Sequence, residues 1–324
     1  MKSPDFWQKP DSPLARFLTP LGWIYACATA RRLAQGTPWR APVPVICVGN
    51  LTAGGAGKTP VVRDLVARLI EKGCCPGILS RGYGGRERGP LRIDPAVHTA
   101  AQVGDEPLLL AQDAPCWIAA DRAAGARAMV AAGIDVIVMD DGFQNPELAQ
   151  DLRLIVVDGA TGFGNGRPIP AGPLREPVQV GMARGDALIV IGEDRHRLYQ
   201  IFSFQINILQ ANIDTKDKDR LSPAPLFAFA GIGQPEKFRA SLTAAGGTVA
   251  AFRPFADHHQ YTRAELTALS AQAEALGAQM VTTEKDWVRL DAEWRDRITP
   301  VAIALKWQAE AAVTLLLKKL LQGG

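Results

Sequence analysis

Short apolar runs alternate with longer stretches of helical periodicity from residue 43 onward. Runs with the length and β-branched character of strands lie at 43–49, 76–80, 116–120, 134–141, 152–158 and 187–192. Helices are predicted at 60–73, 106–112 and 121–133. The strand runs are continuously apolar, as they are when helices cover both faces of a sheet. The pattern therefore predicts an α/β fold with a mainly parallel sheet.

The pattern changes after residue 193. An alternating, strand-like run at 201–213 is followed by a charged, proline-rich stretch, and we interpret 201–225 as a linker. Strand–helix alternation then continues through 226–233, 238–247, 248–255, 262–277, 278–286, 299–305 and 310–321. The predicted parts are a helical segment (1–35), a core domain (36–200), the linker (201–225) and a smaller α/β domain (226–324).

Composition is typical of a folded globular protein. The 324 residues include 47% hydrophobic and 21% charged residues, which excludes disorder as a description of the whole chain. Lys and Arg number 36 and Asp and Glu 33, so the net charge is +3 and indicates no nucleic-acid partner. The five cysteines lack the spacing of a zinc site and predict reduced thiols in a cytosolic compartment.

One stretch near the N-terminus is relevant to membranes. Residues 17–30 are apolar but contain Pro20 and Gly22, and they are shorter than the roughly 20 residues that a spanning helix needs. Trp23, Tyr25 and the flanking arginines suit a helix that lies among lipid headgroups. A helix packed on the protein's own core fits the same residues. The first residues lack the pattern of a cleavable signal peptide, so none is expected.

The strongest chemical signal is VPVICVGNLTAGGAGKTPVV at 43–62, a strand followed by a glycine-rich loop and a helix. Backbone N–H groups in such a loop wrap phosphates, and the helix N-terminus adds its positive dipole end. We expect Lys58 to reach the β- and γ-phosphates of a nucleotide and the Thr59 hydroxyl to hold Mg²⁺. The strict motif has glycine where this chain has Thr52. The predicted loop consists of Thr52, Ala53, Gly54, Gly55, Ala56 and Gly57.

A phosphate-binding loop of this kind works with a carboxylate that fixes the metal. Asp140 and Asp141 end the run 134–141, where a parallel sheet delivers side chains to its nucleotide edge. Asp158 ends the run 152–158 and is a weaker candidate; a strand-end Asp also caps helices or lies in turns. Together these features predict a P-loop NTPase-type, mainly parallel sheet with a second, smaller α/β domain and an N-terminal amphipathic helix.

Three further segments carry reactive side chains but are ambiguous alone. SRGYGGRERG at 80–89 suits either an anionic substrate or a solvated turn. VGDEP at 103–107 offers Asp105 and Glu106 just before a helix, where capping alone explains them equally well. DHHQY at 257–261 contains adjacent histidines, which suit activation of a hydroxyl but are often incidental on a surface.

Seven motifs in a fixed order resemble the tetraacyldisaccharide 4'-kinases, also called lipid A 4'-kinases. They are NLTAGGAGKTP, SRGYGG, VGDEP, DDGFQ (140–144), PAGPLREP (170–177), DHHQY and TTEKD (282–286). The resemblance implies transfer of the γ-phosphate of ATP to the 4'-hydroxyl of a tetraacylated glucosamine disaccharide 1-phosphate, which gives lipid IV-A for lipopolysaccharide. It also implies Mg²⁺, a lipid substrate, and peripheral binding to the cytoplasmic face of the inner membrane. No obligate protein partner is evident.

The resemblance also implies residue roles. Asp105 and His258 would form the pair that activates the sugar hydroxyl, and the family pattern of Asp followed directly by His favours His258 over His259. Because the pair spans the two predicted domains, their contact would require closure over substrate. The groups implied at the phosphates and the metal are Lys58, Thr59, Asp140, Asp141 and Glu176, with Arg175 adding positive charge and Gln144 in support.

Two other functions share part of these features. A P-loop kinase of a soluble small molecule needs Lys58, Thr59 and Asp140 but no aromatic N-terminal helix. A nucleotide-switch ATPase or GTPase would bind a protein partner; those that dimerise over ATP carry an extra lysine early in the loop, and residues 52–56 contain none. The lipid kinase is favoured over both. The role of TTEKD, structural or nucleotide-related, is left open.

Overall fold

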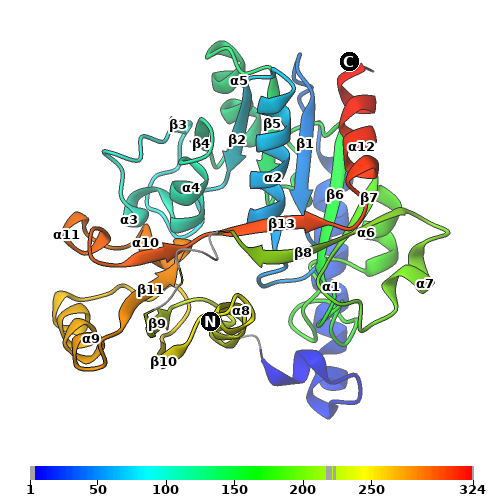
Figure 1. Ribbon diagram of the computed structural model, residues 1–324. Coiled ribbons are helices and arrows are strands. Elements are labelled where there is room, and N and C mark those ends of the chain that lie inside the picture. The colour runs from blue at the N-terminus through cyan, green and yellow to red at the C-terminus, as the bar shows by residue number, and fades with distance from the viewer. Residues whose placement is uncertain (1–3, 217–220, 222–223, 323–324) are drawn as a thin grey trace.

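Two sheets organise the chain in the computed structural model, which describes residues 4–216, 221 and 224–322 (Figure 1). In spatial order the larger sheet consists of β13 (Ile303–Trp307), β8 (Asn207–Thr215), β7 (Ala187–Ile191), β6 (Leu152–Asp158), β1 (Val45–Gly49), β5 (Val136–Asp140), β2 (Pro76–Ser80), β4 (Cys116–Ile118) and β3 (Leu91–Arg92). Neighbouring strands run parallel except at the edges, where β13 pairs antiparallel with β8 and β3 with β4. The predicted mainly parallel α/β fold is confirmed.

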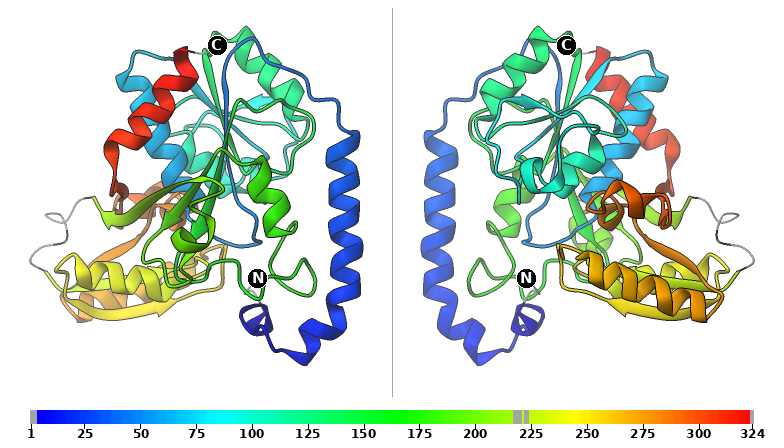
Figure 2. Two further views of the ribbon diagram at one scale, coloured as in Figure 1. Left: turned by 90° about the vertical axis from the view of Figure 1, so that its right-hand side faces the viewer. Right: turned by 90° about the vertical axis from the view of Figure 1, so that its left-hand side faces the viewer.

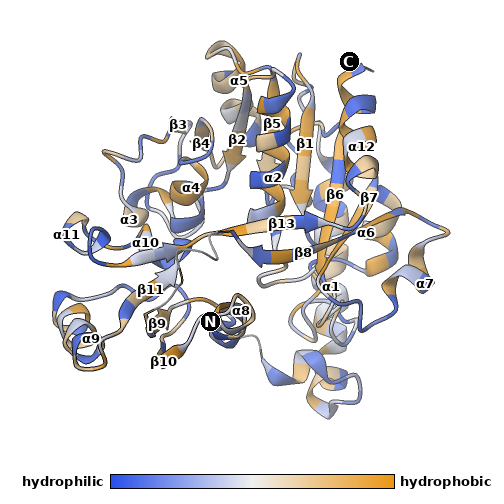
Figure 3. Ribbon diagram, in the orientation of Figure 1, coloured by the Kyte–Doolittle hydropathy of each residue, from blue (hydrophilic) through white to orange (hydrophobic). Residues whose placement is uncertain are grey.

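Helices cover both faces of this sheet. One face is covered by α2 (Lys58–Glu71), α4 (Asp105–Leu110) and α12 (Glu310–Gln322). The other face is covered by α5 (Arg122–Ala131), α6 (Val178–Arg184) and α7 (Leu198–Phe202). Because both faces are covered, every residue of β1, β5 and β7 is buried, which explains why these runs are continuously apolar. Figure 3 shows the central strands as predominantly hydrophobic ribbons.

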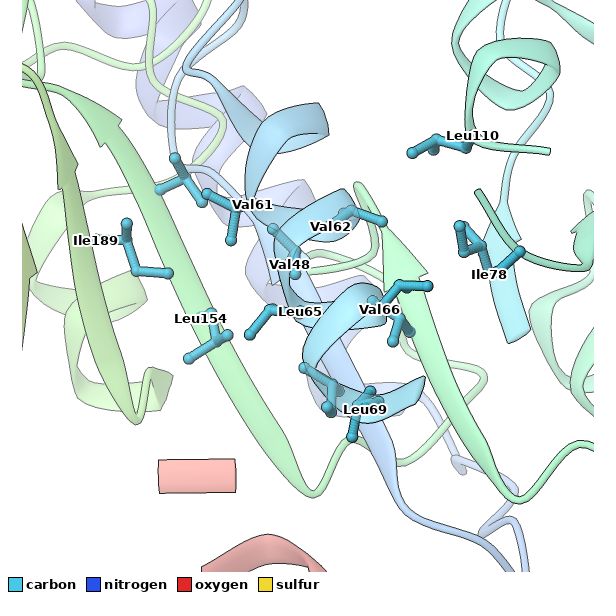
Figure 4. Close-up of a cluster of buried hydrophobic side chains, with 14 of the residues drawn as sticks. Val48, Val61, Val62, Leu65, Val66, Leu69, Ile78, Leu110, Leu154 and Ile189 are labelled. Atoms are coloured by element: carbon cyan, nitrogen blue, oxygen red, sulfur yellow. The ribbon is translucent and has the colours of Figure 1, made fainter. Parts of the chain in front are cut away.

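Helix α2 anchors the glycine-rich loop to the core. Its Val61, Leu65 and Leu69 are buried in one cluster with Val48 of β1 and Leu154 of β6, and Figure 4 shows Leu65 beside Leu154. Burial of each such side chain contributes roughly 1.5–3 kcal/mol. The packing fixes the helix and therefore the position of its first residue, the predicted phosphate-binding lysine.

The smaller sheet is parallel throughout, in the order β10 (Val249–Pro254), β9 (Leu226–Ala230), β11 (Gln279–Thr283) and β12 (Thr299–Val301). Its helices are α8 (Pro235–Ala244), α9 (Arg263–Ala275), α10 (Glu284–Trp287) and α11 (Ala292–Arg295). Phe227 and Phe229 pack toward α9 on one face, and Phe238 and Leu242 of α8 cover the other. This second unit, the small unit, therefore has its own core.

The predicted boundaries of the small unit are corrected by the sheet topology. β8 lies within the stretch interpreted as a linker at 201–225, yet it pairs with β7 in the larger sheet. The predicted final strand at 299–305 divides into β12, in the smaller sheet, and β13, which returns to the larger one. The small unit is thus inserted between β8 and β13 and does not extend to residue 324. Residues 217–220 and 222–223 of the predicted linker lie outside the described residues.

The N-terminal segment forms the 3-10 helix η1 (Asp5–Gln8) and the long helix α1 (Pro13–Gln35), which stands along one side of the molecule (Figure 2). Small residues of α1 face the protein: a Cβ on Gly22 would lie 2.8 Å from the Pro168 carbonyl oxygen. Large apolar side chains face away, since Phe17 is 79% and Ile24 65% exposed. None of the described helices has the length and apolar character that crossing a bilayer requires. The short helix α3 (Ala100–Val103) directly precedes α4 in the larger unit.

Candidate active site

The predicted phosphate-binding loop joins the end of β1 to the start of α2. Gly54 and Gly57 have positive φ angles of 122° and 88°, which glycine adopts without steric cost. The segment that carries the PAGPLREP motif supports the loop, because the Ala53 N–H donates to the Pro173 carbonyl oxygen at 2.7 Å. Strand, loop and helix therefore occur in the order that an anion-binding loop requires.

Lys58 lies in a mixed cluster of charges at this loop. Its Nζ is 3.3 Å from Asn50 Oδ1 and 3.5 Å from Asp141 Oδ1. Arg175 binds Asp141 through two nitrogens, at 2.7 and 3.1 Å. Burial alone would raise the pKa of Asp141, but Lys58 and Arg175 outweigh burial and lower this pKa to about 2. The two cations are thus held next to the loop by an ionised carboxylate.

Asp140 is the buried carboxylate at the end of β5. Ser80 Oγ donates to its Oδ2 at 3.4 Å, whereas Oδ1 has no hydrogen-bond partner in the described part of the chain. Burial, and after it the negative charge of Glu106, raise the pKa of Asp140 to about 7. A buried carboxylate oxygen without a partner is suited to binding a cation, because the cation would favour the charged form.

The donor set near Asp140 fits Mg²⁺ rather than a closed metal cage. Across the described ranges, no three His, Cys, Asp or Glu side chains converge to hold a metal. Magnesium is usually bound in kinases by one or two carboxylates together with phosphate oxygens and waters. The Asp140 carboxylate and the Thr59 hydroxyl are donors of this kind.

A second charged cluster, next to Thr59, was not predicted from the sequence. Thr59 Oγ1 donates to Glu106 Oε1 at 3.5 Å, and Lys285 of α10 forms an ion pair with the same oxygen. Burial would raise the pKa of Glu106, but the Lys285 ammonium outweighs it and lowers the pKa. The TTEKD motif therefore contacts the phosphate-binding region from the small unit.

Glu176 and Gln144 lie beside the loop in a separate network. Both carboxylate oxygens of Glu176 accept from Arg184 Nη2, at 2.6 and 2.7 Å. Gln144 Nε2 donates to Glu176 Oε1 at 2.9 Å and to the Asn50 carbonyl at 3.0 Å. These contacts support the start of the loop through the Asn50 carbonyl. The predicted role of Glu176 at the metal stays a prediction.

Asp158, the weaker candidate for a metal carboxylate, has a different set of partners. Its Oδ2 forms an ion pair with Lys237 of α8, and its Oδ1 accepts from the Ala160 N–H at 2.9 Å. The side chain thus joins the larger sheet to the small unit. It also caps the turn that follows β6, which agrees with the alternative that a strand-end Asp serves a turn and not a metal.

Asp105 and His258 meet across the two units, although 153 residues separate them in the sequence. The Asp105 carboxylate, at the start of α4, is 3.0 Å from Nδ1 of His258. His259 points elsewhere: its Nε2 is 3.1 Å from Glu265 and its ring stacks on Phe255. The structure therefore distinguishes the two histidines by their partners and brings His258, the one that the family pattern favours, into contact with Asp105.

The two members of this pair shift each other's titration. Burial disfavours the charged form of Asp105, but the His258 hydrogen bond and Arg289 hold its pKa well below the usual range. The hydrogen bond to Asp105 in turn raises the pKa of His258. The pair lines a pocket of about 450 Å³ together with Tyr83 and Gly84 of the SRGYGG motif.

Comparison with known proteins finds relatives that match nearly the whole chain. The family model described as tetraacyldisaccharide-1-P 4'-kinase matches residues 14–322. The tetraacyldisaccharide 4'-kinase of Rhodospirillum centenum is 53% identical over 329 residues, covering 100% of this chain and 98% of that protein. The chain belongs to the tetraacyldisaccharide 4'-kinase family. The enzyme of the same name from Gluconacetobacter diazotrophicus is also 53% identical, over 98% of this chain and 97% of its own length.

A solved structure of the family has the same fold. LpxK from Aquifex aeolicus, in a crystal structure in complex with ATP, matches with a TM-score of 0.76 at 26% identity and covers 95% of this chain and 99% of that one. The predicted function is confirmed: the chain is an ATP-dependent 4'-kinase of lipid A biosynthesis, a phosphotransferase. Neither the soluble-molecule kinase nor the nucleotide switch is favoured.

Proposed function

We propose that the chain phosphorylates its lipid acceptor at the 4'-hydroxyl with the Asp105–His258 pair as the base and the loop around Lys58 as the phosphate site. The observation that carries this proposal is the 3.0 Å contact between Asp105 and His258, close to the loop but formed by two different units. Phosphoryl transfer needs mainly positioning and charge stabilisation from the protein. The Asp105–His258 pair and the loop around Lys58 would supply these.

The acceptor side of the reaction needs a base. With Nδ1 held by Asp105, His258 Nε2 is the ring nitrogen that takes the proton from the 4'-hydroxyl. The hydroxyl oxygen then forms a bond to the γ-phosphorus, and the bond from that phosphorus to the β–γ bridging oxygen breaks, which releases ADP. The proton leaves His258 for water before the next cycle.

The phosphate side of the reaction needs positive charge. Lys58 and Arg175, both held next to the loop by Asp141, would stabilise charge on the transferring group. Mg²⁺, when bound, would neutralise phosphate charge. Its protein ligands would be the Thr59 hydroxyl and the Asp140 carboxylate.

Transfer of label tests this function directly. The purified chain is incubated with γ-labelled ATP, Mg²⁺ and the tetraacyldisaccharide 1-phosphate in detergent micelles, and the lipid is separated by chromatography. We expect label in the lipid fraction, and none when the matched 4'-deoxy disaccharide replaces the acceptor. Labelling of the deoxy lipid would contradict the 4'-position as the acceptor.

We also propose that α1 binds the enzyme to the cytoplasmic surface of the inner membrane. The acceptor carries four acyl chains, and each buried CH₂ contributes about 0.8 kcal/mol, so the acceptor stays in the bilayer. The large side chains of α1 are unusually exposed for apolar groups: Phe17 79%, Trp23 56% and Ile24 65%. Arginines at both ends of the apolar stretch suit anionic headgroups.

Changing the exposed face of α1 should weaken membrane binding. We expect the double variant Trp23→Ser, Ile24→Ser to bind anionic phospholipid vesicles at least about tenfold more weakly, because two inserting side chains are lost. Co-sedimentation with vesicles measures this. Ile70→Ser with Leu276→Ser is the matched control, since these residues are also exposed but lie on other elements. Equal binding of both double variants would contradict the role of α1.

A further inference from the structure

Arg289 is a buried cation that contacts the Asp105–His258 pair from behind. It follows α10, and its side chain is 1% exposed. Nε donates to Asp105 Oδ2 at 3.2 Å, and Nη2 donates to the same oxygen. Nη1 donates to the Gly231 carbonyl oxygen at 3.0 Å and to Asp286 Oδ1 at 2.9 Å. All three guanidinium nitrogens therefore have partners, and one of these partners is the carboxylate of the pair.

The Gly231 carbonyl links Arg289 to the backbone of the histidine. The His258 N–H donates to that same oxygen at 3.0 Å. His258 has a φ of +60°, a conformation that a non-glycine residue adopts only when its surroundings hold it there. One guanidinium thus contacts both the Asp105 carboxylate and the carbonyl group that fixes His258.

A second buried carboxylate orients Arg289. Asp286 is 0% exposed, and its Oδ1 accepts from Arg289, from the Tyr261 hydroxyl at 2.8 Å and from the Gly231 N–H at 3.0 Å. Desolvating a charge pair is costly unless the remaining donors and acceptors are also satisfied, as they are here. The guanidinium is therefore held in one position between the units.

We propose that Arg289 is a positioning residue for the proton-accepting pair: it orients Asp105, supports the backbone of His258 and sets the pH range in which the pair works. The proposal rests on the proposed function of that pair. Arg289 acts on the sugar hydroxyl only through His258, so it is not itself a catalytic residue.

The charges around His258 explain the expected effect on pH dependence. Asp105 of α4 binds Nδ1, Asp257 of its own loop lies 3.8 Å from Nε2, and the Tyr83 ring centre lies 6.5 Å from the imidazole. The Asp105 hydrogen bond raises the pKa of His258, and Arg289 opposes this increase. Removing the guanidinium therefore raises the pKa further, and the neutral base forms only at higher pH.

The test compares Arg289→Gln with Arg263→Gln, a variant of an arginine on α9 that is 78% exposed. For each full-length protein, kcat and the KM for the lipid are measured across pH in micelles with labelled ATP. We expect Arg289→Gln to lower kcat about tenfold to a hundredfold and to move the acid limb of the profile to higher pH. Arg263→Gln should keep the wild-type profile. In a His258→Ala background, Arg289→Gln should add little further loss.

Arg289→Lys decides the case if Arg289→Gln does not fold by its melting curve. A lysine keeps a positive charge but lacks the planar fork that binds Asp105 and Gly231 through separate nitrogens, so we expect a lowered kcat with a smaller pH shift. An unmoved acid limb in whichever variant folds, or losses that simply multiply with those of His258→Ala, would overturn the inference. A wild-type rate for His258→Ala alone would instead contradict the proposed function of the pair.

Discussion

We expect replacement of Lys58 by alanine to lower kcat for phosphate transfer by about 10³-fold, because the variant loses a cation that stabilises charge on the transferring phosphoryl group. The ammonium group is 3.5 Å from Asp141 at the end of the phosphate-binding loop, and its side chain is 11% exposed. A charge at this depth is little screened by solvent, so its loss is felt in the transition state. The measurement is kcat with labelled ATP, Mg²⁺ and saturating lipid.

The control for this prediction is Lys72→Ala, which removes an exposed lysine after the other end of the same helix. It should keep the wild-type kcat. Both variants should still fold, because the helix is anchored by its buried apolar face. A folded Lys58→Ala protein that transfers phosphate as fast as Lys72→Ala would show that the phosphate site lies elsewhere.

Asp105→Ala and His258→Ala should each lower kcat about 10²- to 10⁴-fold, the usual range for losing a base. Because the two side chains act as one unit, the double variant should be no slower than the slower single variant. His259→Ala is the matched control and should be close to wild type, since its imidazole binds Glu265 instead. Losses that multiply in the double variant would show that the two residues act separately.

The pH dependence of kcat gives a second measurement on this pair. His258 must be neutral to accept a proton, and its hydrogen bond to Asp105 raises its pKa above the ordinary 6.5. The rate should therefore begin to fall, as the pH decreases, at a higher pH than an isolated histidine would give. Asp105→Asn removes the negative charge, so the acid limb should move to lower pH while the maximal rate drops. A limb that stays in place would contradict His258 as the base.

The strands of the larger sheet could be predicted because their burial is so complete. Residues 76–80 and 152–158 were predicted with the bounds that β2 and β6 have, since a strand covered on both faces leaves a continuous apolar run. β8 was predicted as strand-like but assigned to a linker. It lies next to the edge strand β13 and is only partly buried. Its sequence therefore lacks the continuous apolar run that would have assigned it to the larger sheet.

The loop chemistry of the site could be predicted from local motifs and the Asp105–His258 pair from the family resemblance, whereas the contacts of Arg289 and Lys285 could not. Lys58 follows one predicted strand and Asp140 lies at the end of another, and parallel topology brings strand ends together. Arg289 and Lys285 lie in the small unit, and their partners Asp105 and Glu106 lie at the start of α4. Such contacts depend on how the two sheets are placed relative to each other, and no spacing along the chain encodes that. The motif order of TTEKD was the one available signal for Lys285.

A crystal structure of this chain with Mg²⁺ and a non-hydrolysable ATP analogue tests directly whether the loop around Lys58 is the phosphate site. We expect the γ-phosphate to lie against Lys58, the metal to contact the Thr59 hydroxyl and Asp140 Oδ1, and His258 to face the γ-phosphate from the acceptor side. A nucleotide whose phosphates lie away from residues 50–59, or a metal held without Asp140, would contradict this expectation.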